Sequence, residues 1–364
     1  MRLWLGVLLG SLLGTAGAEA TELAVTFFDI GQGDSAMIVS PTGKHVLIDG
    51  GPPEAGDRLL AALSRHRVSQ LDLIVLSHPH ADHLGGLKKV VSTLPVRMFL
   101  DAAFPTTSPS YAGLLSLLAT RGVEVKQAAL GRQIDLGDGA ALTLLGPPSP
   151  WLANTRSDVN ANSVLVRLTW RARSALFTGD AEPETERWLL GRPLTGSQSL
   201  QAELLKVAHH GGRFSSTAPF LQAVGPRLAV ISVGVGNDYG HPTPEALGRL
   251  AQTGARILRT DQDGEVTVRS RDGQPWQVET ARASGPAPGP VASTPGPAPI
   301  PTPPAAPRGP AAGRVDFVGS TRSQVFHRSD CGGGQRIVAT NLVRFATREA
   351  ALASGRRPAE DCHP

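Results

Sequence analysis

A run of three histidines and one aspartate within six residues constrains the fold of this chain more than any other feature. The run is His78-Pro79-His80-Ala81-Asp82-His83, and Ser77 separates it from the apolar residues 73–76. Imidazole and carboxylate groups are the natural ligands of zinc and similar divalent ions. The spacing directs His78 and His80 toward one ion, and Asp82 and His83 toward a second. One loop cannot close such a site, so further ligands must come from distant parts of the chain.

Other acids and histidines stand where predicted strands end. Six of the ten histidines fall in three loops, each just after an apolar strand, and two acids beside glycines end further strands. Acids are also common at ordinary strand–turn junctions, so they gain weight only together with the histidines. The candidate distant ligands are Asp49, Asp180, His209, His210 and His241.

Composition divides the 364 residues into four parts. Residues 1–20 have a basic start, a short apolar run and small residues before a cleavage point, which predicts a secretory signal and a secreted or periplasmic protein. Residues 21–282 form the main domain. Residues 283–313 are a spacer, because eleven of the thirty prolines lie between 284 and 310. Residues 314–364 form a small C-terminal unit.

Charge is distributed unevenly between these parts. Residues 21–282 carry no net charge, whereas residues 314–364 carry eight arginines against five acids. The main domain therefore lacks the basic excess expected of a protein that binds duplex DNA tightly.

Short apolar runs alternate with helical patterns in the main domain, which indicates an α/β fold. Two sheets packed face to face with helices outside would accommodate this pattern. Strands are predicted over 23–28, 36–39, 45–48, 73–76, 142–145, 163–168, 175–178, 204–207, 228–232 and 266–270, and helices over 58–64, 111–120, 183–190, 218–223 and 244–252.

These ordered motifs resemble the metallo-β-lactamase fold and, more narrowly, the hydrolase-like domain of ComEC-type competence proteins. The resemblance covers nearly all of residues 21–282 and implies an αββα sandwich with a two-metal site at one edge of the sheets. The matching stretches are 28–35, 47–51, 76–87, 158–163, 178–180, 206–211, 237–242 and 259–261 with Gly264.

The resemblance also implies a role for each ligand of the two metals. His78 and His80 would bind the first metal, Asp82 and His83 would bind the second, and Asp180 would bridge both. Asp82 would also orient the attacking water that two cations activate.

Other roles stay open at this point. His210 or His209 would complete the ligand set, and either of them, or His241, would contact a leaving or phosphate oxygen; His241 is alternatively a further ligand. Asp49 and Asn160 would lie behind the ligands. Asn160 belongs to the region from 84 to 179, which contains no histidine although the wider superfamily has a metal ligand there. The first metal would then be under-coordinated, weakly bound, or manganese rather than zinc.

The Gly31–Asp34 segment is either part of the rim of this site or a turn between strands.

The C-terminal unit is too small to be stable without a staple. It resembles a small α+β metal-binding domain of the Ada type, but Ala359 stands where that family has the first of two final cysteines. Either His327, Cys331 and Cys362 hold a metal, or the two cysteines form a disulfide.

The sequence thus predicts an exported hydrolase with two divalent metals that cleaves phosphodiester bonds in DNA, including single-stranded DNA, or in another extracellular phosphate polymer. A link to DNA uptake would require a separate membrane channel or cell-surface partner. The alternatives are a hydrolase of a small ester such as phosphorylcholine and a non-catalytic DNA-uptake module.

Overall fold

The computed structural model describes residues 21–282 and, in the C-terminal unit, residues 317–321, 323, 325–329, 334, 337–338 and 341–359. The predicted signal segment, the spacer, Cys331 and Cys362 lie outside the described residues. No helix of the described part is long and apolar enough to span a membrane.

The first sheet of the main domain has eight strands in the order β15-β14-β1-β2-β3-β4-β5-β6. Its strands are β1 (Glu22–Phe27), β2 (Ala36–Val39), β3 (His45–Ile48), β4 (Leu71–Val75), β5 (Val96–Asp101), β6 (Glu124–Gln127), β14 (Val266–Arg271) and β15 (Gln277–Thr280).

The second sheet has seven strands in the order β13-β12-β11-β10-β9-β8-β7. Its strands are β7 (Gln133–Gly137), β8 (Ala140–Leu144), β9 (Val166–Trp170), β10 (Arg173–Phe177), β11 (Leu204–Lys206), β12 (Leu228–Ile231) and β13 (Arg256–Arg259).

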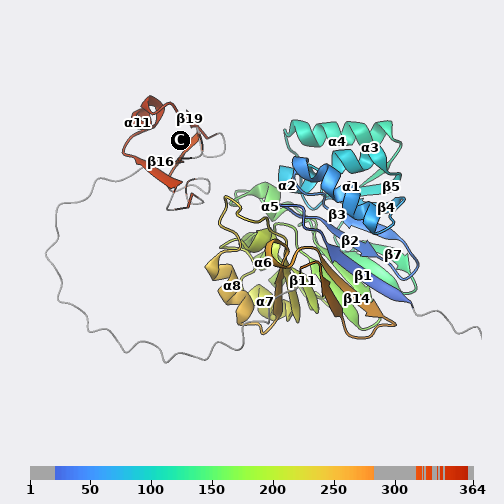
Figure 1. The fold of residues 1–364 in the computed structure, drawn as a ribbon. Coiled ribbons are helices and arrows are strands. Elements are labelled where there is room, and N and C mark those ends of the chain that lie inside the picture. Colours follow the sequence, from blue (N-terminus) through green and yellow to red (C-terminus); the bar gives the residue numbers. More distant parts are fainter. Residues whose placement is uncertain are drawn as a thin grey trace, which may run out of the picture.

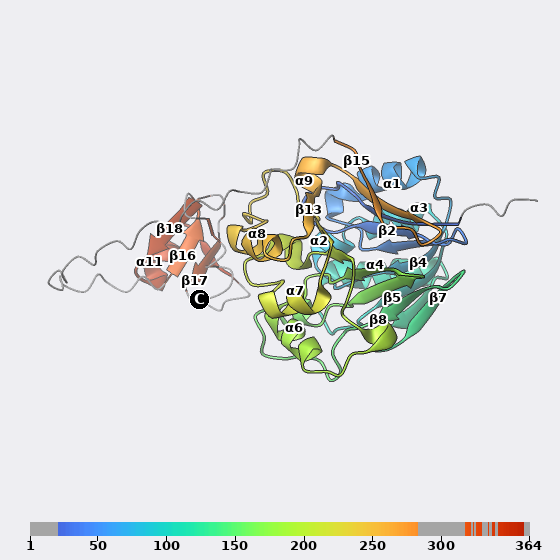
Figure 2. The same cartoon turned by 90° about the horizontal axis from the view of Figure 1, so that it is seen from below.

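Helices cover the outer faces of both sheets (Figures 1 and 2). They are α1 (Gly56–Arg65), α2 (Ala81–Leu84), α3 (Leu87–Thr93), α4 (Pro109–Thr120), α5 (Asp158–Ala161), α6 (Pro183–Leu190), α7 (Ala218–Val224), α8 (Pro244–Ala251) and α9 (Thr260–Asp263), with short 3₁₀ turns η1 (Pro53–Ala55), η2 (Gly196–Gln198) and η3 (Ala208–Gly211).

The strand pattern explains the layers, because successive side chains of a strand point to opposite faces. In β3, Val46 and Ile48 enter the core between the two sheets, whereas Leu47 enters the core beneath α1, α3 and α4. In β12, Val230 enters the central core, and Ala229 and Ile231 face α7 and α8. The predicted αββα sandwich is confirmed.

Parallel pairing brings the loops that carry the candidate ligands to one edge of the sandwich. β3 pairs with β4 in one sheet, and β11 pairs with β10 and β12 in the other, all in parallel. The carboxyl ends of parallel strands lie at the same edge of a sheet. Asp49 follows β3, the run 78–83 follows β4, Asp180 follows β10, and His209 and His210 follow β11.

The described part of the C-terminal unit has a four-stranded sheet in the order β18-β16-β17-β19. The elements are β16 (Phe317–Ser320), β17 (Val325–Arg328), β18 (Leu342–Phe345), β19 (Arg357–Pro358) and one helix, α11 (Arg348–Ala353). This is the small α+β unit that the sequence predicts. His327 lies in β17, but its predicted partners Cys331 and Cys362 are outside the described residues.

Candidate metal centre

The loop between β4 and α3 is held close to the β3 end by backbone contacts that only glycine permits. The amide of Gly50 donates to the carbonyl of His83 at 2.6 Å, and the amide of Gly86 donates to that of Gly51 at 3.1 Å. A Cβ atom on Gly86 would lie 2.2 Å from the carbonyl oxygen of Gly50. This close packing sets the start of α2 and hence the position of Asp82 and His83.

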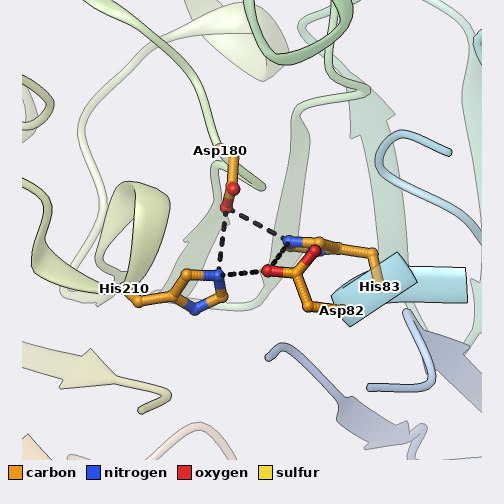
Figure 3. A group of neighbouring side chains, drawn as sticks. All are labelled: Asp82, His83, Asp180 and His210. Atoms are coloured by element: carbon orange, nitrogen blue, oxygen red, sulfur yellow. Dashed lines mark hydrogen bonds and ion pairs between the residues drawn. The ribbon is translucent and has the colours of Figure 1, made fainter. Parts of the chain in front are cut away.

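Four side chains converge on one point at the sheet edge (Figure 3). Asp82 and His83 come from α2, Asp180 from the loop after β10, and His210 from η3, and one ligand atom of each lies within 4.8 Å of the others. Nε2 of His83 is 3.3 Å from Oδ1 of Asp180, and Nε2 of His210 is 3.3 Å from Oδ2 of Asp82. These distances suit a group of ligands around one divalent ion.

The hydrogen bonds of the two imidazoles leave the correct nitrogen available for a metal. Nδ1 of His83 lies 2.9 Å from Oδ2 of Asp49, and Nδ1 of His210 lies 2.9 Å from the carbonyl oxygen of Ser232. Each Nδ1 therefore carries the proton, and each Nε2 turns its lone pair toward the centre. Nε2 of His83 and Oδ1 of Asp180 are buried and have no hydrogen-bond partner among the described residues, which fits a site built for a cation.

A second group of nitrogens faces the other oxygen of Asp180. Nε2 of His78 lies 3.8 Å from Oδ2 of Asp180, and Nε2 of His209 lies 3.7 Å from the same atom. Nδ1 of His80 is 3.0 Å from Nε2 of His78. The two oxygens of Asp180 thus face two different sets of imidazoles.

Ser77 links the two sets from behind, a role that sequence reasoning missed. Its hydroxyl donates to Oδ2 of Asp49 at 2.7 Å and lies 3.0 Å from Nδ1 of His78. Since the hydroxyl proton is used by Asp49, the oxygen accepts from Nδ1 of His78, which leaves Nε2 of His78 unprotonated. In this structure that nitrogen faces Nδ1 of His80. A serine between a strand and a histidine run is too ordinary a residue for this function to be visible in the sequence.

The carboxylates dominate the electrostatics of the centre. Burial disfavours the charged form of His83, but the carboxylates of Asp180, Asp82 and Asp49 outweigh it and hold the pKa well above its ordinary value. Burial likewise opposes charge on His210, yet Asp180 and Asp34 raise its pKa to about 10. The buried carboxylates thus favour positive charge at this centre, and a bound divalent ion would supply that charge in place of protons.

Asp34 and Lys206 form a buried ion pair beside the centre, which the sequence analysis also missed. Oδ1 of Asp34 is 3.2 Å from Nδ1 of His210, and the ammonium of Lys206 donates to the carbonyl oxygen of Gly179 at 3.3 Å. The Gly31–Asp34 segment therefore connects two strands and also places the Asp34 carboxylate beside the centre. The signal in the sequence was a lysine inside the apolar strand β11.

Two further predicted residues, His241 and Asn160, lie near the centre but outside the quartet of Asp82, His83, Asp180 and His210. The ring of His241 is 5.6 Å from that of His209 and 6.3 Å from that of His210, centroid to centroid. The side chain of Asn160 is buried, and its Oδ1 has no hydrogen-bond partner in the described part of the chain.

A cavity of about 820 Å³ opens over the centre. Its wall in the main domain includes His80, Asp82, Asn160, Asp180 and His209, and residues of the C-terminal unit, among them Ser323 and His327, also border it. The ligands are therefore accessible from a space large enough for a substrate segment.

Comparison with known proteins gives relatives for this arrangement. The model of the metallo-beta-lactamase superfamily matches residues 29–103. ComE operon protein 3 of Bacillus subtilis is 28% identical over 270 residues, which are 70% of this chain and 34% of that protein. Competence protein ComA of Neisseria gonorrhoeae is 30% identical over 271 residues, which are 73% of this chain and 35% of that protein. The chain thus spans about a third of the length of these relatives.

Among solved structures, Zn(2+)-bound PqqB of Methylobacterium extorquens is similar with a TM-score of 0.44 and 12% identity, over 65% of this chain and 97% of that one.

Proposed function

Because the chain has the metallo-β-lactamase fold and is homologous to the competence proteins ComE operon protein 3 and ComA, we propose that it is a two-metal hydrolase that cleaves phosphodiester bonds in DNA or another extracellular phosphate polymer. The observation that supports this most is the position of Asp180. Oδ1 lies 3.3 Å from Nε2 of His83, and Oδ2 lies 3.7 Å from Nε2 of His209. A carboxylate so placed would bridge two ions.

The residues present fit two divalent cations, zinc or manganese. Asp82, His83, Asp180 and His210 would hold one, and His78, His80 and Asp180 would hold the other. Such a pair of cations supplies a water that is deprotonated near neutral pH and neutralises charge on a phosphoryl oxygen. The side chain of Asp82 is 32% exposed, so it faces the cavity and would orient that water and accept its proton.

Side chains on the cavity wall would hold the phosphate. Arg156 lines the cavity, and its guanidinium lies 3.5 Å from the ring centroid of Phe214. A guanidinium binds phosphate oxygens through paired hydrogen bonds. His241, whose ring centroid lies 5.6 Å from that of His209, would donate to the leaving oxygen. Because the main domain has no net charge, we favour a single strand held locally at the centre over a duplex.

The competence relatives support a link to DNA uptake. In that process a separate membrane channel or cell-surface protein would be the partner, and the signal-like sequence of residues 1–20 would export the chain.

The test is cleavage by the purified chain loaded with Zn²⁺ or Mn²⁺. Single-stranded DNA, duplex DNA, bis(p-nitrophenyl) phosphate and a phosphorylcholine ester are compared, with His80→Ala as the site variant and His45→Ala, at the start of β3, as the control. We expect cleavage of single-stranded DNA and the chromogen that His80→Ala abolishes and His45→Ala retains. Cleavage of the phosphorylcholine ester alone, or binding of DNA without turnover under either metal, would overturn the proposal.

A further inference from the structure

The first metal position lacks one ligand that its histidines would need. His78 and His80 supply two nitrogens and Asp180 supplies Oδ2, but no histidine occurs from residue 84 to residue 179. Three protein donors leave a divalent ion short of the four that zinc takes in closed sites. The described residues around this position offer two further donors.

His209 is the first of them. Its Nε2 lies 3.7 Å from Oδ2 of Asp180, and its Nδ1 lies 3.2 Å from Oε1 of Glu182, whose side chain is 5% exposed. A buried carboxylate on Nδ1 fixes the tautomer and directs the Nε2 lone pair forward, as it does behind metal-bound histidines generally. His209 therefore has the same arrangement as His83 with Asp49.

The backbone of η3 makes this possible for two successive histidines. His209 and His210 both have left-handed conformations, with φ of 52°, which cost on the order of 1–3 kcal/mol for such residues. Their ring planes are 72° apart. As a result Nε2 of His210 lies 3.7 Å from Oδ1 of Asp180, and Nε2 of His209 lies 3.7 Å from Oδ2. The two neighbouring histidines thus face different oxygens of one carboxylate.

Asn160 is the second donor. Its side chain is 3% exposed, lines the same cavity as His80, Asp180 and His209, and its Oδ1 has no hydrogen-bond partner within the described residues. The backbone of Asn160 is held in place, because its N–H donates to Oγ of Ser157 at 3.3 Å and its carbonyl oxygen accepts from the hydroxyl of Ser163 at 2.8 Å. A buried amide oxygen without a partner costs free energy unless something binds it.

We propose that His209 and Asn160 complete the first metal position in place of the absent histidine, with Glu182 orienting His209. The donors are then three imidazole nitrogens, a carboxylate oxygen and an amide oxygen. Five donors with a hard amide oxygen suit Mn²⁺ better than tetrahedral Zn²⁺. The inference rests on the two-metal centre proposed above and states which residues form its weaker half.

The test measures metal binding without any substrate. The whole chain and the variants Asn160→Ala, Asn160→His, His209→Ala and Glu182→Gln are titrated with Mn²⁺ and Zn²⁺, with metal content and electron paramagnetic resonance as readouts and His45→Ala as the control. The wild type should bind two Mn²⁺ with a spin-coupled signal. Asn160→Ala, His209→Ala and Glu182→Gln should weaken one of the two sites about 10–100-fold and give the signal of a single Mn²⁺.

Asn160→His separates a ligand role from a structural one. A histidine at this position should shift the preference of the weaker site from Mn²⁺ toward Zn²⁺, which loss of packing cannot do. Unchanged Mn²⁺ affinity and a retained coupled signal in both Asn160→Ala and His209→Ala would overturn the inference, even if the enzyme cleaves DNA. Two bound metals with the expected variant effects but no cleavage of any phosphodiester would instead overturn the proposed function alone.

Discussion

Oδ2 of Asp49 lies 2.9 Å from Nδ1 of His83 and 2.7 Å from the hydroxyl oxygen of Ser77 that donates to it. Asp49 would thus act on the proposed metal centre through its neighbours, since one carboxylate orients His83 directly and His78 through Ser77.

Asp49→Asn should therefore weaken metal binding without unfolding the chain. If the amide oxygen takes the place of Oδ2, the NH₂ group faces the backbone N–H of Ser77, which donates to Oδ1 at 2.7 Å in the wild type. If the amide is turned the other way, the NH₂ group faces Nδ1 of His83 and the hydroxyl of Ser77, so His83 loses its fixed orientation in either case. We expect metal affinity to fall about 10–100-fold, measured by calorimetric titration with Zn²⁺. Asp57→Asn, at an 84% exposed side chain in α1, is the matched control. Equal affinity in the two variants would contradict the role given to Asp49.

Lys206→Met should destabilise the fold strongly. The ammonium of Lys206 and the carboxylate of Asp34 are 4% and 6% exposed, and removal of one partner leaves the other charge buried without compensation. We expect a loss of about 3–5 kcal/mol in the free energy of unfolding, measured by urea denaturation. Lys126→Met breaks the exposed pair with Glu124 and should cost less than about 1 kcal/mol. Similar losses in both variants would show that the buried pair contributes no more to the free energy of unfolding than the exposed pair.

Gly86→Ala should destabilise the fold and weaken metal binding through a steric clash, without backbone strain. The backbone of Gly86 has φ of −70°, which alanine adopts readily, but the added Cβ would lie 2.2 Å from the carbonyl oxygen of Gly50. We expect a loss of about 1–3 kcal/mol in unfolding free energy together with weaker metal binding. Gly248→Ala in α8, where the Cβ meets no atom of the described residues within 4 Å, should gain about 0.5–1 kcal/mol. A neutral Gly86→Ala would contradict the close packing of the two loops.

Metal binding should strengthen as pH rises. The pKa of His210 in the folded, metal-free chain is about 10, above the value of about 6.5 for an unfolded chain. Protonated His210 therefore stabilises the metal-free fold fully below about pH 6.5, and this contribution disappears as the pH rises toward 10. A metal needs the neutral Nε2, so it must displace the proton.

Titration calorimetry at several pH values, in buffers of different ionisation enthalpy, checks this prediction. We expect proton release on binding and an affinity that increases between pH 6 and pH 9. His210→Gln should release at least one proton fewer. Binding that neither releases protons nor depends on pH would contradict the protonated state of the free centre.

The alternation of apolar runs with helical patterns and the resemblance to the metallo-β-lactamase fold predicted the sandwich. The candidate ligands of the centre could be found because histidines and acids are concentrated at strand ends. His78, His83 and His210 could be chosen from residue type and position, and the structure brings them to one edge of the sheets with Asp180. Five strands of the main domain escaped the sequence analysis, namely β5, β6, β7, β13 and β15. All but β5 lie at sheet edges, and the side chains of β6 and β15 are mostly exposed or half-buried and show no apolar run.

The roles of Ser77, Glu182 and Lys206 were missed for a different reason, and Asp34 was named only as the end of the Gly31–Asp34 segment. Each is an ordinary polar residue whose role comes from a partner brought near by the tertiary fold, as Lys206 is brought to Asp34 across the two sheets. Local patterns carry no information on such contacts. The pairing of His209 with Glu182 likewise depends on the left-handed backbone at His209, which a non-glycine residue rarely adopts.

Each of the two sheets would contribute two ligands to the proposed quartet. Asp82 and His83 follow a strand of the first sheet, whereas Asp180 and His210 follow strands of the second. An ion held by all four would cross-link the two sheets, and its binding free energy would add to the stability of the folded domain. Loss of the metal would then weaken the contact between the two sheets as well as abolish activity. Chelation should therefore hasten proteolysis of this chain.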